Sequence, residues 1–213
     1  MSDLSDFTGW LDANHVEGVV GEVGWPGGPE AERWNELARR WFAAADAAHV
    51  GVFVWGAAQA WSATYPLAVY RSGASGQLVS GPQAPVVEEH VGRPASPPSP
   101  TSGGGEELRG VDLAGGSFGA DLGDAGSYSA ANPGRYGEDY TYASSEFLGQ
   151  LAAHGIHAVR LAVMWERLQP RLGQPLDATE VGRVRTVLED ARRAGISVVL
   201  DLHNYGRYAG TGP

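Results

Sequence analysis

The sequence predicts an α/β fold in which parallel strands alternate with helices and form part of a barrel. Short apolar runs alternate with amphipathic helical patterns on both sides of one central stretch, and this alternation is typical of a parallel sheet. The apolar runs also end in polar or aromatic side chains, at Glu22, Trp55, Asp112, Arg160 and 203–205. A barrel gathers such groups at the carboxyl ends of its strands, whereas a doubly wound sheet usually adds a Gly-rich phosphate turn, for which the sequence offers no well-placed candidate.

The first half of the chain contains two predicted strands with a helix between them. Residues 18–23 and 51–55 are short valine-rich runs that predict strands. Gly28 and Pro29 open the helix, because proline is favoured in a first helical turn. Apolar side chains follow at helical spacing, at Trp34, Leu37, Ala38, Trp41, Phe42 and Ala45. This face of the helix, with both tryptophans, is expected to face the core.

The second half repeats the same order. Strands are predicted at 108–113, 157–162 and 196–202, and a helix at 144–154 ends before Gly155.

The last predicted helix has the clearest signals at both ends. Asp177 and Glu180 form a capping box at its start, and Gly195 ends it. Its apolar stripe comprises Val181, Val184, Val187, Leu188 and Ala191.

The central stretch is rich in proline, serine and glycine. Almost nothing in residues 91–107 can be buried, and loops this long are uncommon inside compact folds. We interpret it as a linker between two segments, 1–90 and 108–213; a long surface loop within one domain is the alternative.

Composition excludes several classes of protein. The 213 residues include no cysteine, which excludes disulfide scaffolds, thiolate metal sites and cysteine nucleophiles. The net charge of -10, with 15 Lys+Arg against 25 Asp+Glu, argues against nucleic acid as a partner. No apolar run approaches the roughly 18 residues of a membrane helix, so no membrane association is expected, and the first residues lack the pattern of a signal peptide.

Five strand-like segments resemble glycoside hydrolase family 5, the cellulase family. Residues 109–115, 159–170 and 199–205 resemble its first three strands, whereas 19–26 and 52–56 resemble its seventh and eighth, and 82–90 resemble its closing helix. The resemblance implies a partial (β/α)8 TIM barrel with strands in the order 7-8 and then 1-2-3.

The resemblance also implies roles for individual residues. Glu22 matches the nucleophile, and Arg160 would hold its carboxylate charged and oriented. His203 and Asn204 would contact sugar hydroxyls near the cleavage point, so these four residues form the implied catalytic set.

Aromatic residues would bind the polysaccharide or oligosaccharide substrate. Trp55 matches the sugar-stacking tryptophan, and Tyr205 and Trp61 are further candidates for substrate binding. Trp61, Tyr65 and Tyr70 either line a glycan cleft or cover the rim of the barrel.

The order of the segments is unusual, because the end of a barrel precedes its beginning. Tandem barrels joined by the linker are favoured over a single permuted barrel, and in tandem barrels Glu22 and Arg160 would never meet. If the two segments instead docked as one open arc, Glu22 would lie close to Arg160 and His203. Strands four to six are lacking in either case, and with them the acid/base glutamate, because the single Asn-Glu pair, Asn35-Glu36, lies on a predicted helix.

Each assignment has a simpler alternative. Glu22 could be a surface carboxylate, and Arg160 a structural ion-pair partner. Asp201 and His203 lie two apart on one strand and so share a face, which raises a metal site. No other histidine follows a convincing strand, so we expect no metal and no cofactor. Asp112 departs from the asparagine often found in this segment of the family.

Two functions follow from the sequence. The first is a fragment of a retaining β-glucanase, inactive alone because it lacks the acid/base glutamate; the second is a non-catalytic carbohydrate-binding remnant or degenerate barrel. The family suggests an extracellular protein, although this chain shows no export signal, and neither the glycan nor the oligomeric state follows from the sequence.

Overall fold

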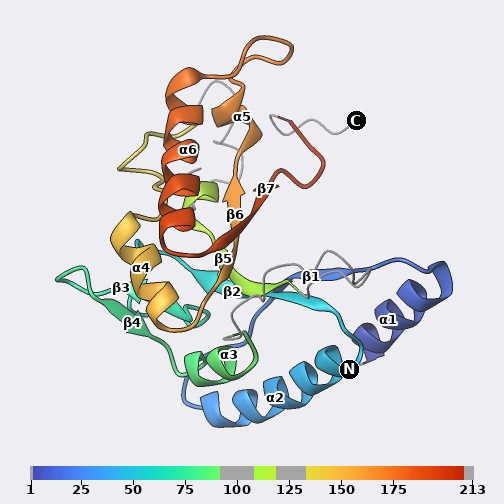
Figure 1. The fold of residues 1–213 in the computed structure, drawn as a ribbon. Coiled ribbons are helices and arrows are strands. Elements are labelled where there is room, and N and C mark those ends of the chain that lie inside the picture. Colours follow the sequence, from blue (N-terminus) through green and yellow to red (C-terminus); the bar gives the residue numbers. More distant parts are fainter. Residues whose placement is uncertain (1, 92–107, 119–132, 209–213) are drawn as a thin grey trace.

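The fold was analysed in a computed structural model, which describes residues 2–91, 108–118 and 133–208 (Figure 1). Most of the predicted linker, residues 92–107, therefore lies outside the described residues. Within the described residues, no helix combines the length and apolar character needed to cross a membrane.

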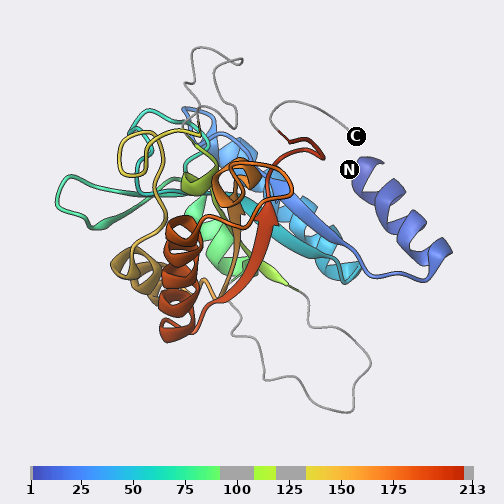
Figure 2. The same cartoon turned by 90° about the horizontal axis from the view of Figure 1, so that it is seen from above.

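Five parallel strands form one continuous, open sheet. These are β1 (Val19–Val23), β2 (Gly51–Ala57), β5 (Arg109–Leu113), β6 (Ala158–Val163) and β7 (Ser197–Leu202). They pair in that order, each parallel to the next. The predicted α/β fold with mainly parallel strands is confirmed, and the two segments of the chain form the continuous open arc described above (Figures 1 and 2).

A short hairpin of β3 (Tyr70–Ser72) and β4 (Leu78–Ser80) extends the sheet beside β2. The sequence did not predict this hairpin. Tyr70 is fully buried in it and donates a hydrogen bond to Glu88 Oε1 over 3.1 Å, so it lines neither a cleft nor a rim.

Most of the helices flank the sheet (Figure 1). The helices are α1 (Ser2–Asn14), α2 (Ala31–Ala47), α3 (Ala84–Val91), α4 (Ser145–Ala153), α5 (Trp165–Leu168) and α6 (Ala178–Arg193), with a 3-10 turn η1 (Gly115–Ser117). Helices α2 and α3 lie side by side near β1 and β2, whereas α4 and α6 lie side by side near β6 and β7 (Figure 1). Helices α1 and α5 were not predicted.

The predicted helix boundaries are confirmed where local signals define them. Asp177 accepts a hydrogen bond from the backbone N of Glu180 over 2.8 Å at the start of α6. Ser144 caps α4 in the same way by accepting from Phe147 N. Gly155 and Gly195 follow these two helices with φ values of 80° and 73°, which glycine adopts without strain.

The two segments of the chain share one core. Strand β2 of the first segment pairs with β5 of the second, and apolar side chains from both belong to a single buried cluster. Arg109 at the start of β5 forms an ion pair with Asp46 of α2. Gly110 lies so close to β6 that a Cβ there would be 2.0 Å from Ala158 O. The segments therefore meet in this chain, and their division at 91–107 stays a prediction.

Candidate active site

Arg160 lies at the centre of the polar cluster at the carboxyl ends of the strands. Its Nη1 donates to Asp112 Oδ1 over 3.0 Å and to Gly21 O over 3.1 Å. Its Nη2 donates to Asp201 Oδ2 over 2.8 Å and lies 3.3 Å from His203 Nδ1. Burial alone would lower the pKa of Arg160, but the hydrogen bond to Asp112 and the charges of the surrounding carboxylates raise it, so the guanidinium stays charged.

Glu22 meets this cluster from β1. Its Oε2 lies 3.5 Å from Arg160 Nη1, a longer contact than the one that Asp112 makes with the same nitrogen. The Glu22 side chain is 46% exposed, so its carboxylate is open to an incoming ligand. Glu22 therefore meets Arg160, as expected for one docked arc and contrary to the favoured tandem arrangement, but Arg160 is shared with other acids.

Asp112 is the most buried acid of the cluster, with 1% of its side chain exposed. Its Oδ2 is buried and has no hydrogen-bond partner. Burial is the main cause that raises the pKa of Asp112 to about 7, and the charges of Glu22 and Asp201 also raise it. The hydrogen bond from Arg160 and its positive charge lower this pKa. The sequence flagged Asp112 only as a departure from a family pattern.

His203 is held by a chain of hydrogen bonds after β7. Its Nδ1 lies 2.8 Å from Asp201 Oδ2, and its Nε2 lies 3.1 Å from the hydroxyl of Tyr205. Tyr205 has a φ of 52° and is largely exposed, so its ring projects from the site. Asp201 therefore orients His203 and Arg160 together.

Asn204 is buried and hydrogen-bonded inside the protein. Its Oδ1 accepts from the backbone N of Trp165 over 2.7 Å, and its Nδ2 donates to Glu166 Oε2 over 2.7 Å. Through these two hydrogen bonds Asn204 connects the end of β7 to α5. The sequence did not predict a role for Glu166, because nothing in the residues around it indicates that its side chain is buried.

Of the predicted aromatic residues, Trp55, Trp61 and Tyr65 lie together at β2, whereas Tyr205 lies beside His203. Trp55 donates from Nε1 to the Tyr65 hydroxyl over 2.9 Å. The Trp61 ring centroid lies 5.5 Å from that of Trp55 and 4.7 Å from that of Tyr65. The ring centroid of Phe118 lies 6.0 Å from that of Trp61. These four rings, Trp55, Trp61, Tyr65 and Phe118, are called the aromatic cluster below.

The alternative of a metal site has no support in the described part of the chain. No group of three or more histidine, aspartate or glutamate side chains there could hold a metal ion. Asp201 and His203, the pair that raised this alternative, are both in contact with Arg160.

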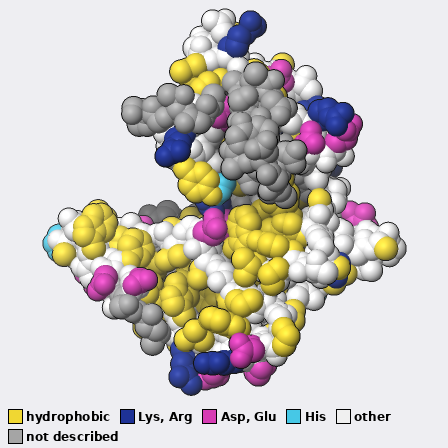
Figure 3. All heavy atoms as spheres, turned by 180° about the vertical axis from the view of Figure 1, so that it is seen from behind, with side chains coloured by type: hydrophobic (Ala, Val, Ile, Leu, Met, Phe, Trp, Pro, Cys, Tyr) yellow, Lys and Arg dark blue, Asp and Glu magenta, His cyan; other side chains and the backbone are white. Residues whose placement is uncertain are grey.

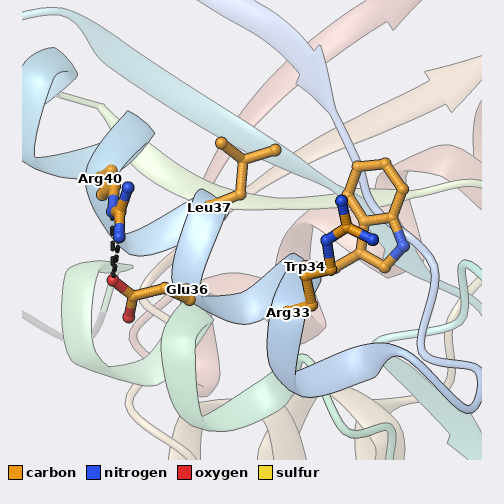
Figure 4. A pocket seen from close by; sticks show the side chains of 5 residues that line it. All are labelled: Arg33, Trp34, Glu36, Leu37 and Arg40. Carbon is orange, nitrogen blue, oxygen red and sulfur yellow. Dashed lines mark hydrogen bonds and ion pairs between the residues drawn. The ribbon is translucent and has the colours of Figure 1, made fainter.

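A separate apolar groove runs along α2. It has a volume of about 390 Å³ and is lined by Arg33, Trp34, Glu36, Leu37 and Arg40 (Figure 4). Trp34 is 38% exposed, so the expectation that it faces the core is wrong, whereas Trp41 does pack against the core. The face of the molecule opposite to the view of Figure 1 carries a broad hydrophobic area (Figure 3).

Comparison with curated proteins finds endoglucanases. The chain is 32% identical over 111 residues to "Endoglucanase gh5-1" of Neurospora crassa, covering 52% of this chain and 26% of the relative. It is 30% identical over 78 residues to "Endo-beta-1,4-glucanase B" of Emericella nidulans, covering 37% of this chain and 24% of the relative. The chain thus spans about a quarter of the length of these relatives.

Solved structures give similar partial matches. XacCel5A in complex with cellopentaose is 35% identical, with 49% of this chain and 30% of that chain covered and a TM-score of 0.43. The endoglucanase Cel5A of Pseudomonas stutzeri in complex with cellobiose is 31% identical, with 49% and 29% covered and a TM-score of 0.43.

A family match covers the second segment. Residues 118–213 match the family described as Cellulase (glycosyl hydrolase family 5). This confirms the resemblance drawn from 159–170 and 199–205, while the assignments of 19–26, 52–56, 82–90 and 109–115 lie outside the match and stay predictions. Over residues 118–213 the chain is therefore similar to glycosyl hydrolase family 5, the cellulase family.

Proposed function

We propose that this chain is part of a retaining glycoside hydrolase that cleaves O-glycosidic bonds in a β-linked polysaccharide of the cellulose or β-glucan type. The observation that carries the proposal is the approach of Glu22 on β1 to Arg160 on β6, with 3.5 Å between Oε2 and Nη1, across the intervening parallel strands β2 and β5. The relatives are endo-β-1,4-glucanases by name, and one similar structure holds cellopentaose.

In the proposed reaction Glu22 is the nucleophile. Its carboxylate attacks the anomeric carbon, and the bond from that carbon to the leaving oxygen breaks. Arg160 keeps the attacking group ionised through its positive charge. The aromatic cluster offers ring faces on which a pyranose can pack.

We propose that no second catalytic carboxyl group lies beside Glu22 among the described residues. A retaining hydrolase needs an acid about 5 Å from the nucleophile to protonate the leaving oxygen. The other two acids of the cluster, Asp112 and Asp201, are both bound to Arg160, and Asp112 is buried. We therefore propose that the acid/base glutamate is absent and that the isolated chain does not hydrolyse an unactivated β-glucan.

A substrate that needs no acid tests the nucleophile by itself. Dinitrophenolate leaves as a stable anion, so 2,4-dinitrophenyl 2-deoxy-2-fluoro-β-cellobioside can glycosylate a carboxylate without proton donation. We expect a covalent adduct of one fluorocellobiosyl group by intact-mass analysis, located on Glu22 by peptide mapping. The Glu22→Gln variant should remain unlabelled, and Glu36→Gln, on the exposed face of α2, should label like the parent chain.

Two results would contradict the proposal. Labelling at another carboxylate, or equal labelling of the Glu22→Gln variant, rejects Glu22 as nucleophile. If the parent chain steadily hydrolyses soluble β-glucan and the Glu22→Gln variant does not, an acid is present and the proposal that it is absent is wrong.

The aromatic cluster favours a second candidate, carbohydrate binding without catalysis. Three of its rings, Trp55, Trp61 and Tyr65, contact one another beside β2. Binding of cellopentaose, measured by calorimetry, without any adduct on Glu22 would support this candidate. Trp61→Ala should then weaken binding, whereas Trp10→Ala, which removes an exposed ring on α1, should not.

A further inference from the structure

Three carboxylates compete for one guanidinium in the site. Asp112 and Arg160 are register partners on β5 and β6, so their side chains lie next to each other on one face of the sheet. Nη1 is shared by Asp112 at 3.0 Å and Glu22 at 3.5 Å, whereas Nη2 binds Asp201 at 2.8 Å. His203 Nδ1 also lies 3.3 Å from Nη2. Glu22 therefore makes the longest of the three ion pairs with Arg160.

The three acids differ in burial, which affects how strongly each is attracted to Arg160. The Asp112 side chain is almost fully buried, Asp201 is about one-quarter exposed and Glu22 is nearly half exposed. An ion pair is strongest where water is excluded, so Asp112 gains most from Arg160. Water screens the contact with Glu22 instead.

Asp112 also carries a feature that its neighbours lack. Its Oδ2 is buried without a partner, and an unpaired charged oxygen is costly to bury. A proton on Oδ2 removes that charge and weakens the hydrogen bond and ion pair between Oδ1 and Arg160 Nη1. Burial raises the pKa of Asp112 to about 7, which agrees with proton uptake near neutrality.

We propose that Asp112 is a positioning residue for Arg160: its ionised carboxylate draws Nη1 away from Glu22, and its protonated form releases Nη1 to Glu22. The groups that bear on Asp112 are Arg160 on β6, Glu22 on β1 and Asp201 on β7, with His203 acting through Arg160 and Asp201. As a statement about catalysis, this inference rests on the function proposed above.

The test follows the surroundings of the Glu22 carboxylate without substrate. The side-chain carboxyl carbon of Glu22 is followed by ¹³C NMR from acid to alkaline pH in the full chain, with Glu22→Gln identifying its resonance. In the parent chain we expect this resonance to shift with an inflection near pH 7, because Asp112 ionises there and draws Nη1 away from Glu22. In Asp112→Asn this inflection should vanish, because no carboxylate at position 112 then competes with Glu22 for Nη1.

Asp201→Asn is the matched control, since it also removes one negative charge but leaves the contact between Asp112 and Nη1. It should keep the inflection near pH 7. Loss of the inflection in both variants overturns the inference, because removal of one negative charge would then explain the result. An absent inflection near pH 7 in the parent chain also overturns it, even if Asp112→Asn does not fold. Neither result bears on the labelling of Glu22, so this inference and the proposed function fail separately.

Discussion

Replacing Asp112 by asparagine should change how the stability of the fold depends on pH. The pKa of Asp112 is raised from 3.8 to about 7. A group whose pKa is higher in the folded state stabilises the fold at pH values below its unfolded pKa, and this contribution is lost as the pH rises through the folded pKa. The window for Asp112 therefore runs from about pH 4 to about pH 7.

The size of the effect follows from the same shift. Each pKa unit corresponds to about 1.4 kcal/mol, so a shift from 3.8 to about 7 corresponds to about 4 kcal/mol. Asparagine has no charge to bury, and its neutral amide oxygen binds Arg160 more weakly than a carboxylate does. The free energy of unfolding of Asp112→Asn relative to the parent chain should therefore rise by a few kcal/mol between pH 4 and pH 8.

Urea unfolding followed by circular dichroism measures this difference. The comparison between variants cancels the titration of groups that both chains share. Glu36→Gln is a suitable control, since it removes an exposed ion pair with Arg40 and should change stability by less than about 1 kcal/mol at any pH. A difference between Asp112→Asn and the parent that stays constant from pH 4 to pH 8 would refute the reasoning.

Two further predictions concern the core. Gly110→Ala should cost several kcal/mol in urea unfolding, since its Cβ would lie 2.0 Å from the backbone oxygen of Ala158, whereas Gly149→Ala on α4, with nothing within 4 Å, should stabilise the fold by up to about 1 kcal/mol. Equal effects would contradict the close approach of β5 and β6. Glu180→Gln should cost roughly 3 kcal/mol, because the buried carboxylate accepts from Tyr140, Tyr142 and Arg183. A loss below about 0.5 kcal/mol in thermal and urea unfolding would show that this network is dispensable.

The sequence predicts those features that depend on neighbouring residues. The cap formed by Asp177 and the stop at Gly195 are local, and both are present in the structure. The strands follow from runs of β-branched residues, which the pairing of β2 with β5 and of β6 with β7 confirms.

The sequence did not predict features that depend on contacts between residues far apart in the chain. Whether Asp112 or Glu22 holds Arg160 more closely depends on burial and on strand register, which no pattern reports. Asn204 was assigned to sugar contact, but the turn after β7 directs its amide to Glu166. Trp34 has helical spacing typical of a core position, and its exposure depends on what packs beside α2.

In the part of the chain that the structure describes, no strand closes the sheet on either side. Among the described residues, β1 pairs only with β2 and β7 only with β6, which leaves the outer backbone groups of both strands free to bond elsewhere. Val19, Leu200 and Leu202 are exposed along these margins. Free strand margins with apolar side chains recruit further strands, either from another chain or from additional sequence. The behaviour of this protein at high concentration will therefore depend on which polypeptide completes its sheet.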